Sequence, residues 1–163
     1  MSTTGKIHLF GDHIDTDVIL PGKYLNLYTP EDLGPHCMEG IDPTFTKRVA
    51  RGDVLVGGKN FGTGSSREHA PIAIKAVGVS CIVAVSFARI FYRNAINIGL
   101  PVFECQELVE AAQNGAPITA DLKLGTFVTN GKHFQAKPFS PYIQRIMDSG
   151  GLVHFVRTEF SQK

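Results

Sequence analysis

The residues best suited to chemistry lie in one glycine-rich run, Gly58 to Pro71, with the sequence GKNFGTGSSREHAP. It follows a short apolar run, Val54 to Val56, and leads into a segment with helical character. Glycines let a backbone approach a ligand closely, and the first free amides of a helix attract anions. The guanidinium of Arg67 matches the geometry of a carboxylate. The run therefore predicts a binding site for an organic acid or a phosphate.

The same run leaves other interpretations open. Ser65 and Glu68 have the spacing of a capping box, in which both side chains only satisfy end amides of a helix. His69 could act as a general base for a serine, but no Gly-x-Ser-x-Gly turn is present, and a hydrogen-bonded structural histidine is the simpler interpretation. The glycine spacing matches neither a Walker A loop nor a dinucleotide-binding turn, which disfavours a nucleotide.

A second polar cluster, Gly11 to Asp17, contains Asp12, Asp15 and Asp17. Short Asp side chains accept hydrogen bonds from nearby amides, so a tight turn explains the cluster without a ligand. A calcium site is a weaker alternative, because the twelve-residue loop with its closing Glu is missing. The functional alternative is a carboxylate that orients an arginine or a substrate hydroxyl.

The size and net charge of the chain favour a globular protein that binds neither nucleic acid nor membranes. The chain has 163 residues, 43% of them hydrophobic, and a formal net charge of +1. This balance predicts one globular domain over residues 1–163. Nucleic-acid binding rests on clustered Lys and Arg, so no nucleic-acid partner is expected. No apolar run approaches the ~20 residues that span a bilayer, and the first residues lack a signal-peptide core; we expect a cytoplasmic protein without membrane contact.

The three cysteines, Cys37, Cys81 and Cys105, are odd in number and widely spaced. They form neither a paired disulfide framework nor a CxxC metal motif. We expect them to be reduced packing residues, and we expect no metal or other cofactor in this chain.

Strand and helix patterns alternate through the middle of the chain, which predicts an α/β layered fold with a mixed sheet. A hairpin is expected at Asn130-Gly131, because both residues tolerate positive φ. Helix starts are expected at Ser86, before Phe87 to Ile98, and at Ser140-Pro141. The β-type runs are Lys6 to Phe10, Asp53 to Val56, Cys81 to Val85, Val102 to Phe103, Ile118 to Leu122 and Thr126 to Val128.

The stretch Asp12 to Gly40 lacks such patterns and is rich in Pro and Gly. It predicts a long exposed loop with one short helix near Pro30 to Leu33. Long ordered loops commonly contact ligands or partners. A stripe of Arg89, Arg93 and Asn97 at helical spacing is a second candidate for a solvated or partner-facing surface.

Three ordered runs carry a resemblance that covers nearly the whole chain. They closely resemble the small subunit of 3-isopropylmalate dehydratase, and they are also similar to the archaeal homoaconitase small subunit and the C-terminal swivelling domain of aconitase. The runs are Asp15-Thr-Asp17-Val-Ile, Gly58 to Pro71, and Ser86-Phe-Ala-Arg89-Ile-Phe-Tyr-Arg93-Asn94-Ala-Ile-Asn97-Ile-Gly99-Leu-Pro101.

The resemblance implies a β/β/α swivelling domain and a hydro-lyase that removes water from a 2-hydroxy dicarboxylic acid and adds it back at the neighbouring carbon. It implies a large partner subunit with a [4Fe-4S] cluster. By motif, the resemblance implies that Ser65 would be the base that takes the proton α to a carboxylate. Ser66 and Arg67 would bind a substrate carboxylate, and Asp17 matches an active-site aspartate with an orienting role.

The resemblance also points to a loop that selects the substrate's side group, Tyr24 to Thr29. Several relatives carry an arginine after the Tyr-Leu pair, whereas this chain has Asn26. The absence of that arginine disfavours a second distal carboxylate, and Leu27 and Tyr28 would offer an apolar surface to an isopropyl group. We therefore expect isopropylmalate isomerisation in leucine biosynthesis.

Two alternatives remain at this point. The nearer one is a homoaconitase or a 2,3-dimethylmalate dehydratase small subunit. The other is a standalone module that binds a small anion at Ser65 to Arg67 without any partner.

Overall fold

Strand β1 (Ser2–Leu9) lies at the centre of a seven-stranded sheet with the order β4-β3-β2-β1-β5-β6-β7. Its second half pairs in parallel with β2 (Val54–Val56), with Ile7 opposite Val54. Its first half pairs antiparallel with β5 (Pro117–Asp121). The sheet of this computed structural model, which describes residues 2–162, is therefore mixed, as predicted.

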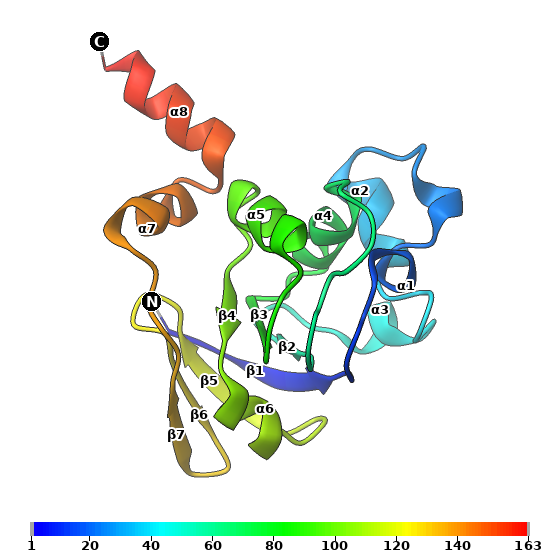
Figure 1. Cartoon of the computed structure of the whole chain (residues 1–163), viewed down its shortest axis with the longest axis vertical. Helices are drawn as coiled ribbons and strands as arrows, with labels where there is room; N and C mark the ends of the chain where they lie inside the picture. The colour runs from blue at the N-terminus through cyan, green and yellow to red at the C-terminus, as the bar shows by residue number, and fades with distance from the viewer. Residues whose placement is uncertain (1, 163) are drawn as a thin grey trace.

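The other elements complete the two halves of this sheet (Figure 1). The remaining strands are β3 (Cys81–Ala84), β4 (Val102–Glu104), β6 (Thr126–Thr129) and β7 (Lys132–Gln135). The helices are α1 (Thr16–Ile19), α2 (Pro30–Leu33), α3 (Phe45–Arg48), α4 (His69–Ala76), α5 (Arg89–Asn97), α6 (Gln106–Ala111), α7 (Pro141–Asp148) and α8 (Leu152–Ser161), with 3-10 turns η1 (Gly22–Tyr24) and η2 (Gly34–His36).

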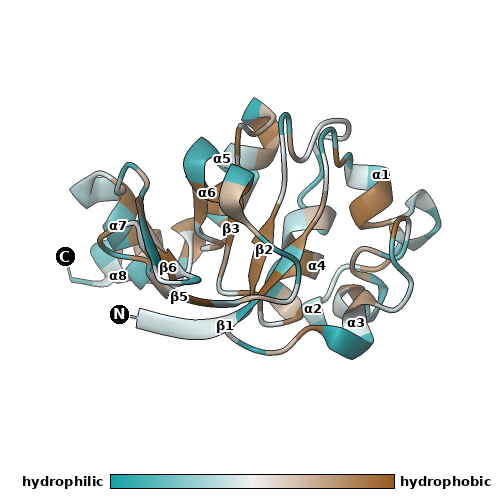
Figure 2. Cartoon of the chain, turned by 90° about the horizontal axis from the view of Figure 1, so that it is seen from below, coloured by the Kyte–Doolittle hydropathy of each residue, from teal (hydrophilic) through white to brown (hydrophobic). Residues whose placement is uncertain are grey.

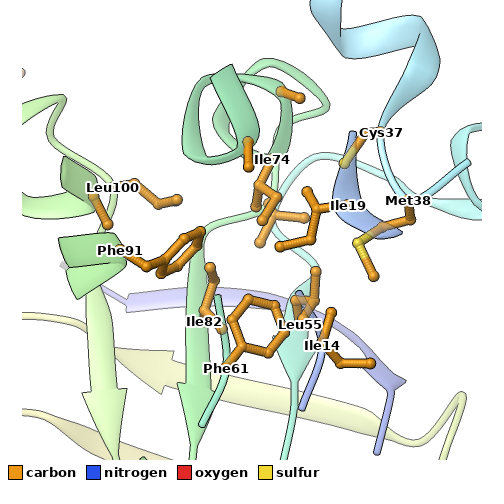
Figure 3. Packing of buried hydrophobic residues seen from close by; sticks show 14 of the residues in the cluster. Ile14, Ile19, Cys37, Met38, Leu55, Phe61, Ile74, Ile82, Phe91 and Leu100 are labelled. Carbon is orange, nitrogen blue, oxygen red and sulfur yellow. The ribbon is translucent and has the colours of Figure 1, made fainter. Parts of the chain in front are cut away.

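The parallel strands separate two hydrophobic cores. Successive side chains of a strand point to opposite faces, so Ile82 joins one core while its neighbours Cys81 and Val83 join the other. The first core lies under α4 and α5, with Leu55, Phe61, Ile74 and Phe91 among its members (Figure 3). Because both faces are covered, β2 and β3 are apolar throughout, which is visible in Figure 2.

The second core joins the two halves of the sheet. Ile7 and Val83 of the parallel half share it with Ile118 and Phe127 of the antiparallel half, and Leu108 of α6 closes it. The antiparallel strands therefore cover one face of the parallel strands while α4 and α5 cover the other, which gives the predicted β/β/α layering. Over residues 2–162, no helix is long and apolar enough to cross a membrane.

A buried polar pair joins the start of β2 to β1. His8 Nε2 lies 2.7 Å from Asp53 Oδ2, and Asp53 also accepts hydrogen bonds from the backbone amides of Lys6 and Ala50. Burial acts to raise the pKa of Asp53, but the hydrogen bonds from His8, Ala50 and Lys6 outweigh it and hold the pKa below its ordinary value. The carboxylate is therefore the form that stabilises this strand pair.

Local signals for two elements are confirmed. Asn130 and Gly131 both have positive φ, at 49° and 74°, in the turn between β6 and β7. Ser140 caps α7 by accepting a hydrogen bond from the backbone amide of Ile143. These turns depend on few neighbouring residues, so short-range rules describe them well.

The prediction of a long exposed loop at residues 12–40 is wrong. The expected helix α2 is present, but α1, η1 and η2 fold there as well. Ile19, Leu33 and Met38 are completely buried in the core under α4. These apolar residues lack a regular period because each belongs to a different short turn, and tertiary packing holds those turns in place.

The prediction that Ser86 caps a helix is also wrong. Helix α5 begins at Arg89 with Ala88 in the capping position, and Ser86 Oγ instead accepts a hydrogen bond from the amide of Asn60 at 2.8 Å. Ser86 thus ties the end of β3 to the glycine-rich run. Helices α6 and α8 were not expected. Helix α8 follows Gly150 and Gly151, which both have positive φ, and projects from the body of the fold (Figure 1).

Candidate functional site

The two polar clusters of the sequence lie side by side at the carboxyl ends of β1 and β2. The backbone amide of Gly62 donates to the carbonyl of Ile14 at 2.7 Å, and the amide of Thr16 donates to the carbonyl of Thr63 at 2.8 Å. Earlier in the same pair of segments, the amide of His13 donates to the carbonyl of Lys59. Parallel strands bring their carboxyl ends to one edge, which is where ligand sites form in such sheets.

Two glycines permit this close approach. A Cβ at Gly58 would lie 1.9 Å from Asp12 Oδ1, and a Cβ at Gly62 would lie 2.1 Å from the ring of Phe91. Gly62 also has a φ of +83°, a conformation that other residues rarely adopt. The glycines of the run therefore serve backbone packing at these two positions.

Asp12 and Asp15 have structural roles. Asp12 accepts a hydrogen bond from the amide of Lys59 at 2.7 Å, and Asp15 caps α1 through the amide of Val18. Within residues 2–162, no group of three or more His, Cys, Asp or Glu is arranged to hold a metal ion. The turn interpretation is therefore confirmed for Asp15, whose bond is local. It is wrong for Asp12, which binds a segment 47 residues away on the chain, and Asp17 remains exposed.

Ser65 lies in a turn before α4 and does not cap that helix. Its amide donates to Thr16 Oγ1 at 2.9 Å, and its own Oγ accepts from the amide of Arg67 at 3.2 Å. Helix α4 begins at His69 with Glu68 in the capping position and no side-chain capping bond. The capping-box interpretation is therefore wrong. A backbone amide already points at the Ser65 oxygen, as stabilisation of an anion there requires.

A small hollow brings together three of the predicted site residues, Asp17, Ser65 and Arg67. Its lining combines these polar groups with apolar side chains, those of Leu20, Leu25 and the buried Ala70. The complete lining is Thr16, Asp17, Leu20, Leu25, Ser65, Arg67, His69 and Ala70. An arginine, a serine and an apolar wall in one hollow suit an organic acid that also carries a hydrocarbon group.

The remaining predicted residues lie beside this hollow. Ser66 is exposed, and its carbonyl accepts a hydrogen bond from Asn94 Nδ2 at 2.8 Å, which ties the turn to α5. Asn26 is exposed, and Leu27 packs against the first core. Tyr28 is 74% exposed, with its ring centroid 5.8 Å from that of His69.

Sequence reasoning missed Thr16, Leu20 and Leu25 as lining residues. Thr16 lies between Asp15 and Asp17, whose carboxylates are the more obvious candidates for a site. Leu20 belongs to an apolar run that is typical of a hydrophobic core. Leu25 belongs to the loop already singled out, but its neighbour Leu27 was selected instead. No sequence signal distinguishes these two leucines; the 3-10 turn η1, which ends immediately before Leu25, determines which one reaches the hollow.

His69 differs from the expected hydrogen-bonded structural histidine. Its Nε2 is buried and has no hydrogen-bond partner among the described residues. The hydrogen bonds of Ser65 involve Thr16 and Arg67, so the structure provides no serine–histidine pair at this turn. The ring of His69 instead supports the ring of Tyr28.

The cysteines do not suit an iron–sulfur cluster. Cys37 lies in the first core, and Cys81 and Cys105 lie in the second. Burial raises the pKa of all three thiols, that of Cys81 to about 12. Cluster ligands are thiolates, which such burial disfavours. The residues of this chain therefore do not fit a [4Fe-4S] cluster.

Comparisons with known proteins agree with this geometry. The model of the aconitase C-terminal domain family matches residues 36–107. A 3-isopropylmalate dehydratase small subunit from Caldicellulosiruptor bescii is 56% identical over 97% of this chain and 96% of its own length. The corresponding protein from Ruminiclostridium cellulolyticum is 48% identical over 99% of this chain and 100% of its own.

A crystal structure of 3-isopropylmalate dehydratase from Methanocaldococcus jannaschii has the same fold. It superposes with a TM-score of 0.92 at 43% identity and covers 98% of this chain and 95% of that chain. The sequence identity to these relatives extends over nearly the full length of the chain, and the fold is the same as in the crystal structure. The chain therefore belongs to the family of 3-isopropylmalate dehydratase small subunits.

Proposed function

We propose that this chain is the part of an isopropylmalate isomerase that binds the substrate's carboxylate and abstracts its proton, in leucine biosynthesis. The enzyme is a hydro-lyase: it interconverts 2-isopropylmalate and 3-isopropylmalate through isopropylmaleate. The observation that carries the proposal is the hollow that Ser65, Arg67 and Asp17 line together with Leu20 and Leu25. Family membership makes this chain the small subunit of such an enzyme.

The base in this proposal is Ser65. As an alkoxide, its oxygen takes the proton from the carbon α to a carboxylate, and the hydroxyl of the neighbouring carbon leaves to give the alkene. A serine hydroxyl is a weak base, so its anion needs stabilisation. The amide of Arg67, which donates to Ser65 Oγ, supplies part of it. The guanidinium of Arg67 adds positive charge nearby.

In this proposal, Arg67 and Ser66 bind the carboxylate of the substrate. Among residues 2–162 the guanidinium of Arg67 has no carboxylate partner, so it is available for a bidentate contact with a substrate carboxylate. The Asn94 hydrogen bond to the Ser66 carbonyl holds the turn while the Ser66 hydroxyl stays exposed. Asp17, exposed at the rim, orients Arg67 or the substrate hydroxyl.

The small hollow does not enclose a substrate, which supports a site shared with a large subunit. The family name itself implies such a partner. We propose that the partner carries the [4Fe-4S] cluster, because the cysteines of this chain do not fit one. In this proposal the complex acts in the cytoplasm. Residues 1–163 of this chain form one swivelling domain in that complex.

The apolar side of the hollow favours an alkyl side group. By the resemblance, Asn26 stands where several relatives carry an arginine, and Leu20, Leu25 and Ala70 are the apolar residues of the lining. A homoaconitase or a 2,3-dimethylmalate dehydratase remains the closest alternative activity. A standalone anion-binding module remains the alternative of another class.

The test combines the chain with a large subunit from the same source, after anaerobic reconstitution of its cluster. Hydration of isopropylmaleate is compared with that of cis-homoaconitate, with each subunit alone as a control. We expect turnover of isopropylmaleate in the mixture only. Faster hydration of cis-homoaconitate would show that the chain is a homoaconitase subunit. Anion binding by this chain alone, without turnover in the mixture, would favour the standalone binding module.

A further inference from the structure

The peptide unit between Ser66 and Arg67 is hydrogen-bonded at both of its polar ends. Its N–H belongs to Arg67 and donates to Ser65 Oγ at 3.2 Å. Its carbonyl belongs to Ser66 and accepts a hydrogen bond from Asn94 Nδ2 at 2.8 Å. The peptide is trans and therefore planar, so its N–H and its C=O point in opposite directions as one rigid group. The bond from Asn94 thus also determines where the Arg67 N–H points.

The serine itself is held from another direction. The backbone amide of Ser65 donates to Thr16 Oγ1 at 2.9 Å, and Thr16 is buried. The amide of Thr16 donates in turn to the carbonyl of Thr63 at 2.8 Å. These two bonds fix the backbone before Ser65, but neither acts on the peptide after Ser66. Among residues 2–162, only Asn94 donates to the carbonyl of that peptide.

Asn94 is anchored in a rigid element. It lies in α5 with its side chain half-buried, and its helix neighbours Phe91, Ala95 and Ile96 are buried in the first core. A carbonyl oxygen attracts an amide NH2 group and repels an amide oxygen, so the donor end of the Asn94 side chain is the one that faces Ser66. The helix therefore presents a fixed donor to the turn.

The direction of the Arg67 N–H matters for the base proposed at this turn. A serine alkoxide is stabilised best by donors that are already aimed at its oxygen. A hydrogen bond accepted by a peptide carbonyl also polarises the peptide and strengthens the bond that its N–H donates. Asn94 can therefore act on Ser65 Oγ through one peptide unit, although it is not among the residues that line the hollow.

We propose that Asn94 is a positioning residue for catalysis: it orients the Ser66–Arg67 peptide so that the Arg67 N–H stabilises the anion of Ser65. The inference rests on the proposed function and extends it to a residue of α5 outside the hollow. Loss of the Asn94 donor should leave Ser65 in place, because Thr16 still holds its amide, but should free the peptide that stabilises the anion.

The first experiment measures steady-state kinetics of the assembled enzyme on isopropylmaleate. Asn94→Ala and Asn94→Asp both remove the donor, and the second keeps the shape of the side chain. Both should lower kcat by at least about tenfold, part of the roughly hundredfold loss typical of a removed anion donor, with KM close to the wild-type value. Gln106→Ala, which removes an exposed amide from α6, is the matched control and should change neither constant.

Two kinetic results would overturn the positioning role. A wild-type kcat in Asn94→Asp would mean that the shape of the side chain matters and its donor does not. A rise in KM with an unchanged kcat would mean that Asn94 supports the binding of the substrate carboxylate instead of the Ser65 anion.

A double-mutant cycle with Ser65→Ala separates this role from general support of the turn. In Ser65→Ala the Arg67 N–H has lost its acceptor, so the addition of Asn94→Ala should lower the residual turnover no further. Losses that multiply would show that Asn94 acts independently of Ser65, and the proposal would be wrong.

Nuclear magnetic resonance of this chain alone tests the geometry without turnover. The amide-proton resonance of Arg67 should move upfield in Asn94→Ala, because the hydrogen bond to Ser65 Oγ weakens. Ser65→Ala, which removes that bond, should move it in the same direction, and Gln106→Ala should leave it unchanged. An Arg67 resonance that does not move in Asn94→Ala would refute the orientation of the peptide by Asn94.

The combined results distinguish the positioning role from the proposed function. If the wild-type complex does not convert isopropylmaleate, the proposed function falls and the catalytic role of Asn94 falls with it. The Arg67 resonance still decides, in that case, whether Asn94 orients the peptide. If the complex is active but Asn94→Ala changes neither kcat nor the resonance, only the positioning role falls.

Discussion

The parallel half of the sheet, β1 to β4, and the antiparallel half, β5 to β7, share one core but end their strands differently. In the parallel half, the segments after β1 and β2 run side by side and carry Asp17, Ser65 and Arg67 to one hollow. In the antiparallel half, β6 and β7 are joined by the two-residue turn Asn130-Gly131. The same core supports both halves.

The difference lies in where strand ends point. Parallel strands direct all their carboxyl ends to one edge, so residues far apart in sequence meet there. Antiparallel neighbours reverse direction, so consecutive ends alternate between edges and are joined by tight turns. The candidate site therefore lies on the parallel half, and the antiparallel half covers one face of the parallel strands. The predictions below test this division, beginning with the largest effect.

Ser65→Ala should lower turnover of the assembled enzyme by about a thousandfold, the usual contribution of a positioned base. Thr119→Ala, on the exposed side of β5, should leave turnover unchanged. Steady-state kinetics on isopropylmaleate with both variants provides the measurement. Turnover of Ser65→Ala near the wild-type value would refute the base assignment. It would also contradict the placement of the active site on the parallel half of the sheet.

Two glycines with similar backbones should respond unequally to alanine. Gly62→Ala combines a φ of +83° with a clash against Phe91 and should cost about 3 kcal/mol or more of unfolding free energy. Gly131→Ala, at a φ of +74° with open space for the new methyl, should cost about 1 kcal/mol. Chemical denaturation measures both. Equal losses would mean that the glycine-rich run is not tightly packed.

Asp53→Ala should destabilise the protein by about 3 kcal/mol at neutral pH, because it leaves His8 and two amides without their buried acceptor. The folded pKa of Asp53 lies below its ordinary value of 3.8, so its contribution is present above that pH and is lost as pH falls through the folded pKa. Wild type should therefore lose stability on acidification more steeply than Asp53→Ala.

The antiparallel half offers the matched control for this pH dependence. Thr129→Val removes the buried hydrogen bond from Thr129 Oγ1 to the carbonyl of Pro117. It should cost about 1 kcal/mol at every pH, since neither partner titrates. Urea midpoints between pH 3 and pH 7 compare the two variants; an acid slope in Asp53→Ala equal to that of wild type would contradict the assignment.

Arg67→Lys should give the smallest effect on catalysis, about a tenfold rise in KM for isopropylmaleate. Lysine keeps the charge but not the paired donors of a guanidinium. The thermal midpoint should not change, because Arg67 is exposed. A fall in kcat without a rise in KM would move Arg67 from substrate binding to support of the Ser65 anion.

Much of the fold follows from local sequence patterns. Most strand patterns, the Asn130-Gly131 turn and the Ser140 cap each depend on residues close together, so they were predictable. The prediction for β1 was wrong at its start: the run expected from Lys6 begins at Ser2, because those polar residues pair with the distant β5. Ser86 was misassigned, because a serine before an apolar run can cap a helix or accept a bond from a distant amide. Its partner, Asn60, lies 26 residues away on the chain. Such a choice is made by tertiary structure.

The residues of the candidate site also differ in whether the local sequence or the tertiary structure identifies them. Ser65, Arg67 and Asp17 belong to polar runs whose composition is unusual, so sequence alone singled them out. Leu25 does not differ in kind from Leu27, and only the structure shows that Leu25, the residue after η1, lines the hollow. Polar residues at a site are conspicuous in a sequence, whereas the hydrocarbon wall opposite them resembles any core.

The double pairing of β1 also bears on how the chain is made. Its second half finds β2 soon after synthesis, with Ile7 opposite Val54, but its first half waits until Asp121 has been added opposite Ser2. At ribosomal rates the 119 residues from Ser2 to Asp121 take about 6 to 24 s to add. An unpaired strand edge invites association between nascent chains. This segment, Ser2 to Lys6, has the sequence STTGK and appears pale in Figure 2, so the edge that waits for its partner carries no large apolar side chain.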